Sequence, residues 1–476
     1  MRFLSLLRAV GVCALLAGSV APAAAQTEAP PAVSRFVLDN GLTLIVKPDH
    51  RSPTAVQMLW VRVGGYDEVG GESGISHMLE HMMFKGTDKL GPGELSRRVA
   101  ALGGFDNAFT TMDYTGYYQQ VPVDKLGDVM ALEADAFAHN RFSDSDFAKE
   151  NQVVQEERRM RTDDNPRALL REQQMAAAFV QSPYHRPVVG WMSDIQALTA
   201  DDVRAWYHKW YVPANAAVVV VGDVDPQNVL ALARKTYGAI PARALPARKP
   251  RPEPAQTGLR RIAVKAPAEQ AVVSLVFRVP KLKDIPDLPQ NRDALALTVL
   301  AGALDGYSGA RLDRALTQGP DRVADGAGAD NGLVGRGPQL FELSGVVAQG
   351  KTAAQVEAGL RAQVTQIAEH GVDESELHRI KTQWVASQIY KRDSVMGQAQ
   401  ELGYWWVQGF PLDMDERLVE RVQSVTAADV QRVAREYFGD DQLTVATLLP
   451  QARTSGAARP APPAVGAGPS PAESMR

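Results

Sequence analysis

Apolar and polar positions along the chain predict two successive sets of strands and helices. In the first set, a mostly apolar strand over 56–63 precedes a glycine-rich break and a helix, and a strand over 216–221 precedes a helix over 227–237. The second set has expected strands over 261–264, 271–279, 340–347 and 443–448, and helices over 292–303, 353–369 and 374–391. Strands followed by helices, twice over, indicate a duplicated α+β unit. We expect domains over 33–240 and 257–449, joined by a proline-rich, basic and extended linker over 241–256.

Both ends of the chain are expected to lie outside these domains. Residues 1–25 have the features of a cleavable export signal, with Arg2 and Arg8 near the start, an apolar run, and three alanines before position 26. The tail over 450–476 has no periodic apolar positions and is expected to be disordered. No later stretch reaches the roughly 18 to 20 apolar residues of a membrane-spanning helix. The mature protein is therefore expected to be periplasmic or otherwise exported, without a membrane span.

The sequence His77-Met-Leu-Glu80-His81 has the spacing of a zinc hydrolase motif. On a helix of about 3.6 residues per turn, two histidines four positions apart share one face and can reach one metal ion. Glu80 lies beside that face, where its carboxylate can act on water. Ser73 or Ser76 is the expected cap at the start of this helix. The same pattern also occurs by chance in amphipathic helices, so the alternative is a solvated face with two histidines.

A catalytic zinc ion usually takes three protein ligands, so a third is expected elsewhere. Cysteine cannot supply it, because Cys13 in the leader is the only one. In the helical stretch that begins at residue 150, Glu150 and Glu157 are seven positions apart and share a face, while Glu156 points away. Glu157 is the better inward ligand, and Glu150 can orient a histidine from further out. The alternative is an acidic, solvated helix.

Composition and charge fit a globular enzyme better than a nucleic-acid-binding protein. A chain of 476 residues, with 45% hydrophobic and 22% charged residues, is long enough for two or more folded domains. The formal net charge of -4 becomes more negative when the two leader arginines are removed. Nucleic-acid binding needs a basic face, and this balance gives it no support.

These residues together resemble the pitrilysin (insulinase) family of zinc peptidases. The matching segments are 71–87, the two glutamates above, 107–110, 183–190 and 198–213, and the resemblance extends from Phe36 to about Leu449. The size and layout are similar to those of the mitochondrial processing peptidase and of bacterial single-length members. The resemblance implies two homologous αβ-sandwich domains in tandem, with helices packed on antiparallel-rich sheets.

The resemblance also implies a role for each residue. His77, His81 and Glu157 correspond to the zinc ligands, Glu80 to the general base, and Glu150 to the residue that supports a ligand. The segment that contains Asn107 and Ala108 corresponds to an edge strand, which an extended peptide joins by main-chain hydrogen bonds. From its pattern alone, this segment is equally well an ordinary core strand.

One departure from the family pattern concerns the second half. Active members usually have an arginine and a tyrosine, seven positions apart, that hold the substrate carbonyl. The corresponding positions here are Thr317 and Ala324, and neither can donate a charged or a phenolic hydrogen bond. Arg314, Arg322 and Tyr307 are nearby alternatives that the sequence does not decide between.

Two functions remain after this comparison. In the first, the chain is a zinc metallopeptidase, or the zinc-bearing subunit of one, and a homologous Arg/Tyr-bearing partner or a second copy completes it. In the second, it is a zinc-binding but hydrolytically idle scaffold of the same family. Glu80 favours the first, because a scaffold does not need a general base.

Overall fold

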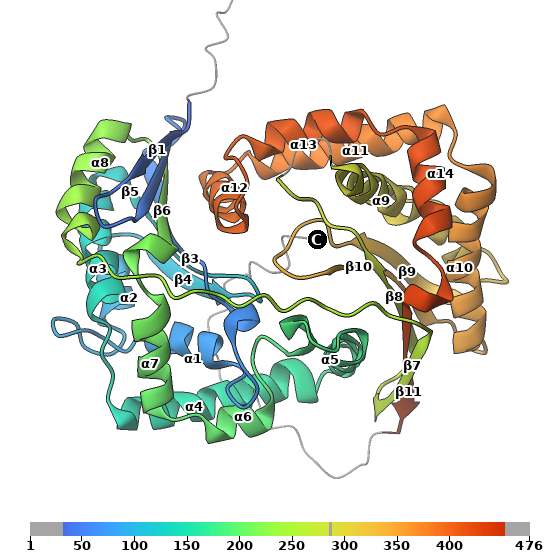
Figure 1. Ribbon diagram of the computed structural model, residues 1–476, viewed down its shortest axis with the longest axis horizontal. Helices are drawn as coiled ribbons and strands as arrows, with labels where there is room; N and C mark the ends of the chain where they lie inside the picture. The colour runs from blue at the N-terminus through green and yellow to red at the C-terminus, as the bar shows by residue number, and fades with distance from the viewer. Residues whose placement is uncertain (1–31, 285–287, 453–476) are drawn as a thin grey trace, which may run out of the picture.

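The computed structural model describes residues 32–284 and 288–452. The described chain forms two halves, each with a β-sheet and several helices, and a linker runs between them along one side of the molecule (Figure 1). The expected leader over 1–25 lies outside the described residues.

The first half is built on a six-stranded sheet in the order β1-β2-β6-β3-β5-β4. Its strands are β1 (Ser34–Val37), β2 (Thr43–Pro48), β3 (Thr54–Val61), β4 (Phe105–Thr110), β5 (Thr115–Pro122) and β6 (Ala216–Gly222). Its helices are α1 (Ile75–Met82), α2 (Glu94–Ala101), α3 (Leu126–His139), α4 (Asp144–Arg158), α5 (Pro166–Ala178), α6 (Met192–Ala197), α7 (Ala200–Trp210) and α8 (Pro226–Lys235). Strand β2 runs parallel to β6, and the other neighbours are antiparallel.

The second half is built on a five-stranded sheet in the order β7-β11-β8-β10-β9. Its strands are β7 (Arg260–Pro267), β8 (Val272–Val279), β9 (Ala324–Asn331), β10 (Gln339–Val347) and β11 (Leu443–Gln451). Its helices are α9 (Pro289–Asp305), α10 (Ala353–His370), α11 (Glu374–Lys391), α12 (Val395–Gln408), α13 (Met414–Gln423) and α14 (Ala427–Glu436). Strand β7 runs parallel to β11, and the other neighbours are antiparallel.

The two sheets repeat one topology, which confirms the predicted duplication. The strand series β2-β6-β3-β5-β4 corresponds in order and direction to β7-β11-β8-β10-β9. In each half the edge strand, β4 or β9, follows a helical segment that itself follows a central strand, β3 or β8. The helix α1 of the first half therefore occupies the chain position that α9 occupies in the second.

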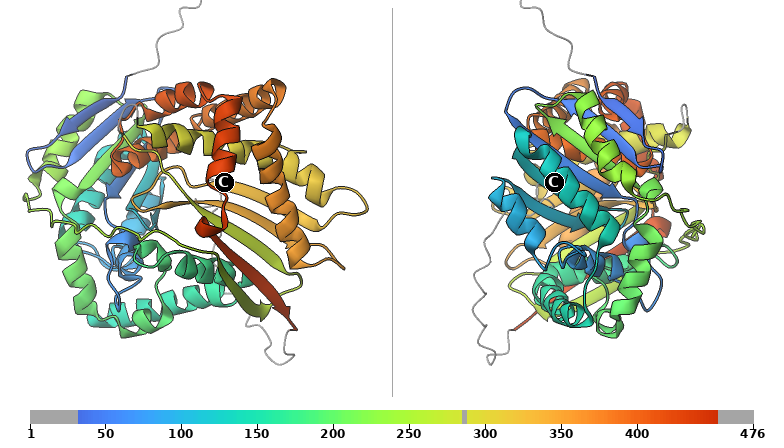
Figure 2. Two further views of the ribbon diagram at one scale, coloured as in Figure 1. Left: turned by 45° about the vertical axis from the view of Figure 1, so that its right-hand side comes forward. Right: turned by 90° about the vertical axis from the view of Figure 1, so that its left-hand side faces the viewer.

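Each sheet is covered on one face by a helix from the other half. Helix α12 packs on β3 and β6 of the first sheet, and α5 packs on β7 and β11 of the second. Figure 2 shows this exchange from two further directions. Because helices cover both of its faces, the first sheet has central strands with continuous apolar runs, and every residue of β6 is buried.

The linker forms no helix or strand between residues 241 and 258, in agreement with its proline-rich sequence. Its basic residues are nevertheless tied to the first half: Arg248 donates to Asp67 at 2.8 Å, and Arg251 donates to the carbonyl oxygen of Glu68 at 2.8 Å. The expectation that the tail is disordered from residue 450 onward is wrong at its start, because β11 continues to Gln451 and pairs with β7. Residues 453–476 lie outside the described chain.

Most of the predicted elements are confirmed with shifted ends. The strand expected over 56–63 is β3, and the helix expected over 292–303 is the longer α9. The helix expected over 227–237 ends at Lys235 and is followed by a short 3-10 turn at Tyr237–Ala239. Strand β9, rich in glycine and alanine, was not predicted, because its sequence lacks the apolar alternation of a half-buried strand.

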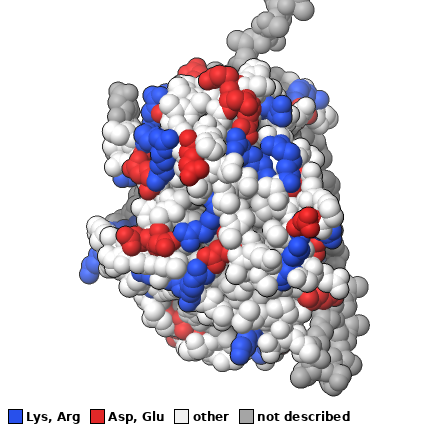
Figure 3. All heavy atoms as spheres, turned by 90° about the vertical axis from the view of Figure 1, so that its right-hand side faces the viewer, with Lys and Arg blue, Asp and Glu red and all other residues white. Residues whose placement is uncertain are grey.

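Acidic and basic side chains are interspersed on the outer face of the second half, as Figure 3 shows. This mixture agrees with the small net charge of the chain and differs from the basic face of a nucleic-acid-binding protein. Among the described helices, none combines the length and the apolarity needed to cross a membrane.

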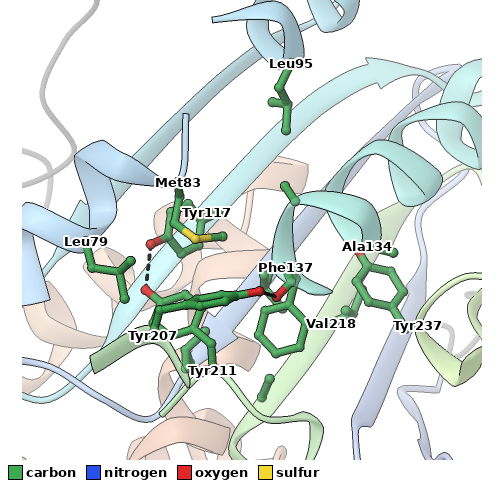
Figure 4. Packing of buried hydrophobic residues seen from close by; sticks show 14 of the residues in the cluster. Leu79, Met83, Leu95, Tyr117, Ala134, Phe137, Tyr207, Tyr211, Val218 and Tyr237 are labelled. Atoms are coloured by element: carbon green, nitrogen blue, oxygen red, sulfur yellow. Dashed lines mark hydrogen bonds between the residues drawn. The ribbon is translucent and has the colours of Figure 1, made fainter. Parts of the chain in front are cut away.

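The core of the first half lies between its sheet and α1, α3 and α7. Leu79 and Met83, in and directly after α1, lie beside a group of tyrosines in this core (Figure 4). The hydroxyl groups of Tyr117 and Tyr211 are 2.7 Å apart, so these two buried side chains satisfy each other. The apolar side of α1 thus packs against the core, and its other side presents His77, Glu80 and His81.

Candidate metal centre

Helix α1 holds His77, Glu80 and His81 on the side that faces α4 and β4. His77 is buried, whereas Glu80 and His81 are half-buried. The apolar residues of the same helix, which include Met78 and Leu79, are fully buried in the core. This division follows from the helical repeat, because positions three and four apart share a face.

The start of α1 differs from the expected serine cap. The helix follows Gly74, whose φ of 88° is in the left-handed region, and this position has no side-chain cap. Ser73 donates its hydroxyl to Asp194 at 2.6 Å, and the buried Ser76 hydroxyl does not cap the helix. The prediction that Ser73 or Ser76 caps this helix is therefore wrong. The carboxylate of Glu68 accepts from two N–H groups at this end instead.

Three side chains converge between α1 and α4. Glu157 Oε2 lies 3.8 Å from His77 Nε2 and 3.3 Å from His81 Nε2, and the three ligand atoms all lie within 4.8 Å of one another. In a tetrahedral site with bonds of about 2.1 Å, two ligand atoms are about 3.4 Å apart. Two imidazoles and one carboxylate at this spacing fit a catalytic zinc ion, which keeps its fourth position for water or substrate.

The neighbours of this triad hold two of its members. His81 donates from Nδ1 to Glu150 Oε1 at 2.9 Å, and Lys85 forms an ion pair with the same carboxylate. Arg161 pairs with the second oxygen of Glu157 at 2.6 Å. A histidine that donates its other ring nitrogen to a carboxylate has a fixed ring orientation and is a stronger ligand.

The electrostatics of the site favour a cation. Burial opposes the charge on Glu157, but His81, His77 and Arg161 together lower the pKa of its carboxyl to about 2. Burial lowers the pKa of His77 to about 4, so that its imidazole is neutral at pH 7. The pKa of His81 is lowered by burial but raised to about 9 overall by the carboxylates of Glu150 and Glu157. Glu157 is therefore ionised at pH 7, and a metal ion bound at Nε2 of His81 would replace a proton that the two carboxylates now stabilise.

Glu80 is not one of the three converging side chains, but it interacts with His81 and Glu157 and is held by β4. Thr110, the last residue of β4, donates its hydroxyl to Glu80 Oε2 at 2.5 Å. Burial raises the pKa of Glu80, and the bond from Thr110 offsets part of that rise. A carboxylate whose pKa is raised toward neutrality is a more effective base.

The edge strand β4 also carries Asn107 and Ala108, which precede Thr110 by three and two residues. Strand β4 pairs with β5 on one side and is the last strand of the sheet on the other. Ala108 donates its N–H to the side-chain oxygen of Asn107 at 2.8 Å. The strand that carries Asn107 and Ala108 also carries Thr110, so the expected peptide-binding edge and the expected base are in direct contact.

The positions expected for the arginine and tyrosine lie in the second half and have structural roles. Thr317 donates its hydroxyl to the carbonyl oxygen of Asp313 at 2.9 Å, and Ala324 is fully buried at the start of β9. The three alternatives lie in the same half: Arg314 donates to the carbonyl oxygen of Gly309, Arg322 donates to Asp325, and Tyr307 lies under the guanidinium of Arg379. None of these contacts reaches α1 or α4.

Sequence reasoning missed Thr110, Lys85 and Arg161 as neighbours of the site. Lys85 lies four residues after His81, and Arg161 lies four residues after Glu157, so a spacing of four in the sequence could have suggested both, although α1 itself ends at Met82. Thr110 is separated from Glu80 by 30 positions, and only the packing of β4 on α1 joins them. Glu68 was also missed, because its carboxylate reaches the helix only when the preceding segment folds over the start of α1.

Comparison with known proteins agrees with this geometry. Residues 43–190 match the family Insulinase (Peptidase family M16), and residues 197–384 match the Peptidase M16 inactive domain. The chain is similar to the Zinc protease PqqE of Helicobacter pylori, with 30% identity over 456 residues, covering 94% of this chain and 100% of that protein. It is also similar to an uncharacterized zinc protease of Streptomyces coelicolor, with 29% identity over 86% of this chain and 87% of that protein.

Solved structures show the same fold. A crystal structure of a protease from Helicobacter pylori has a TM-score of 0.83 and 30% identity, and covers 89% of this chain and 100% of that one. The first half of the periplasmic protease PqqL from Escherichia coli has a TM-score of 0.74 and 21% identity, and covers 89% of this chain and 93% of that one. With two matched domains in tandem and a relative aligned over nearly its whole length, this chain belongs to the insulinase family, peptidase family M16.

Proposed function

We propose that this chain is a zinc metallopeptidase, or the zinc-bearing subunit of one, that hydrolyses peptides or unfolded polypeptides. The observation that carries the proposal is the convergence of His77 Nε2, His81 Nε2 and Glu157 Oε2 within 4.8 Å, with the carboxylate of Glu80 next to them. The names of the relatives, which are zinc proteases, support zinc as the metal.

In this proposal His77, His81 and Glu157 hold the zinc ion, and Glu150 orients His81 through the bond to Nδ1. A bound zinc ion acts as a Lewis acid toward a peptide carbonyl and lowers the pKa of water to about 7. Glu80 accepts the proton of the attacking water and passes it to the leaving amine. Thr110 occupies Oε2 of Glu80, which leaves Oε1 for the water.

The substrate is proposed to bind in extended form along the free edge of β4, near Asn107 and Ala108. Main-chain pairing at a sheet edge recognises an extended backbone more than particular side chains. Because Thr110 ends the same strand, a peptide paired with β4 lies next to Glu80. This arrangement favours unstructured polypeptides as substrates.

The chain is proposed to need a homologous partner that brings the missing arginine and tyrosine. Thr317 and Ala324 supply neither side chain, and Arg314, Arg322 and Tyr307 contact their own half. A second copy of this chain would repeat the same deficiency. A different but homologous subunit, one that has the Arg/Tyr pair, is therefore the better partner.

Export to the periplasm is proposed from the leader features of residues 1–25. One structural neighbour, PqqL of Escherichia coli, is named a periplasmic protease. Fractionation of cells that produce the full chain tests this point, and an uncleaved chain in the cytoplasmic fraction contradicts it.

The test of the peptidase proposal is the variant Glu80→Gln. An amide cannot take a proton from water, so we expect the variant to keep its fold and its zinc and to lose about 100-fold to 10,000-fold in hydrolysis of an unstructured peptide. The matched control is Glu72→Gln, because Glu72 precedes the same helix without contacting the three ligands.

This experiment also separates the peptidase from an idle scaffold. If the wild-type chain, alone and with its partner, binds zinc but cleaves no unstructured peptide, the scaffold function is correct. If Glu80→Gln keeps full turnover, the base lies elsewhere and the assignment of Glu80 fails.

A further inference from the structure

The first turn of α1 is capped by a carboxylate that comes from outside the helix. The N–H groups of Gly74 and Ser76 donate to Glu68 Oε2 and Oε1, both at 2.9 Å. Glu68 is fully buried, and no side chain at the cap position takes its place. The carboxylate therefore satisfies donors that every helix leaves free at its start.

His77 depends on this turn more than His81 does. The ring of His81 is oriented by Glu150 through Nδ1, at 2.9 Å. The Nδ1 atom of His77 is buried and has no hydrogen-bond partner among the described residues. With no such support for its ring, His77 takes its position from the backbone of α1, and it directly follows Ser76.

The residue before Glu68 is held by the second half of the molecule. Asp67 is nearly fully buried, and Arg336, in the loop between β9 and β10, donates to its two oxygens at 2.6 and 2.8 Å. Burial opposes the charge of Asp67, but Arg336 and Arg248 hold the pKa of this carboxyl below its ordinary value. The backbone N–H of Arg336 also donates to Asp113 at 3.0 Å.

The backbone of Glu68 itself is fixed by two further arginines. Its carbonyl oxygen accepts from Arg186 at 2.7 Å and from Arg251 of the linker at 2.8 Å. The segment that caps α1 is thus bound on one side by the first half and on the other by the linker and the second half.

We propose that Glu68 is a positioning residue for His77 and that Arg336 extends this positioning to the second half through Asp67. The inference rests on the proposed zinc site. It gives the second half a role in metal binding although no hydrogen bond or ion pair joins its described residues to the three ligand side chains.

A second anchor limits the size of the effect. Ser73 donates its hydroxyl to Asp194 at 2.6 Å and accepts from the N–H of Trp191 at 2.9 Å. Loss of the Glu68 cap therefore loosens the first turn without releasing it. We expect a graded loss of zinc affinity rather than an unfolded site.

The test measures zinc affinity by chelator competition in folded, full-length variants, with thermal unfolding as the check on folding. Glu68→Gln can no longer accept from both N–H groups, and we expect its zinc affinity to fall by about 10-fold to 100-fold, the range for residues that support metal ligands. Arg336→Met is expected to weaken zinc binding less, by several-fold, because it acts through Asp67. The absorption spectrum of the cobalt-substituted protein is expected to change in Glu68→Gln.

Two controls separate positioning from general stability. Glu133→Gln alters another buried carboxylate of the first half, one that accepts from Gln119 of β5 and not from the N–H groups of α1. Arg311→Met removes a bidentate pair with Glu376, whose two bonds are 2.6 and 2.8 Å long. Arg311 matches Arg336 in burial, because the two side chains are 19% and 20% exposed. We expect both controls to lose stability and to keep wild-type zinc affinity.

Wild-type zinc affinity in folded Glu68→Gln would overturn the role of Glu68. If Glu68→Gln does not fold, Arg336→Met decides, and the inference fails when that variant and Arg311→Met bind zinc equally well. A wild-type chain that binds no zinc would refute the proposed function as well, so the two failures are distinguishable.

Discussion

The two halves of the molecule share one strand topology but differ in what they carry at the corresponding helix. In the first half, α1 follows β3 and holds two histidines and a glutamate on the side that faces α4 and β4. In the second half, α9 follows β8, contains no histidine, and buries ten of its 17 residues. The two halves therefore share the arrangement of strands and helices, but α9 has no counterpart of the histidine pair of α1.

The edge strands differ in the same way. Strand β4 ends in Thr110, which holds the carboxylate of Glu80, whereas β9 begins with the buried Ala324 and is rich in glycine and alanine. The second half instead contributes α12, which covers the first sheet, and Arg336, which holds Asp67. In the proposed peptidase, the second half supports the first, and a partner subunit supplies the arginine and the tyrosine.

Among the differences between the two halves, the largest effect is expected from that missing pair. We expect the purified chain alone to be a poor peptidase and a homologous subunit with the Arg/Tyr pair to raise its turnover by about 100-fold to 1000-fold, the usual effect of one oxyanion donor. The comparison uses one unstructured peptide at saturating zinc. If the lone chain reaches the rate of the pair, the second half is not deficient, and Arg314, Arg322 and Tyr307 have to be examined again.

A smaller effect is expected at Thr110. A hydrogen bond to a charged group is worth about 1.5–3 kcal/mol, so Thr110→Val should lower kcat by about 10-fold to 100-fold and leave KM and zinc content nearly unchanged. Thr110→Ser, which keeps the hydroxyl, should restore most of the rate. Thr111→Val is the control, because the Thr111 hydroxyl contacts only the adjacent turn. Equal rates in Thr110→Val and Thr110→Ser would exclude this role.

The smallest effect concerns support of the first half by the second. Gly403 of α12 lies against Trp60 of β3, and a Cβ at this position would overlap the indole ring. We expect Gly403→Ala to lower the free energy of unfolding by about 1–3 kcal/mol, as overpacking does. Gly439→Ala, in open space, serves as the control in the same thermal unfolding experiment. A wild-type midpoint for Gly403→Ala would show that α12 is loosely packed on the first sheet.

The sequence predicts those parts of the site that depend on spacing within one helix. The histidine pair and the Glu150–Glu157 pair are local patterns, and the structure brings all four side chains together. Residues joined by packing between elements were not predicted. Thr110 reaches Glu80 only because β4 lies on α1, and Glu68 replaces the expected serine cap because a preceding segment folds back over the helix start.

The same division between local patterns and long-range packing applies to the fold. Apolar periodicity identified most strands and the duplicated order, because central strands and amphipathic helices carry a strong signal. It did not show that α5 and α12 are exchanged between the halves, since a helix that packs on a distant sheet has the same periodicity as one that packs on its own. The arginines of the linker also gave no sign of their buried partners in the first half.

The most direct test of the central claim is the zinc content of the purified chain and of His81→Ala. We expect one zinc ion per wild-type chain and none held tightly by the variant, because two of the three ligands are too few for a stable site. His139→Ala is the matched control, since His139 pairs with Asp135 on the surface of the same half and should leave the metal content unchanged. Stoichiometric, tightly held zinc in His81→Ala would contradict the assignment of His77, His81 and Glu157 as the metal ligands.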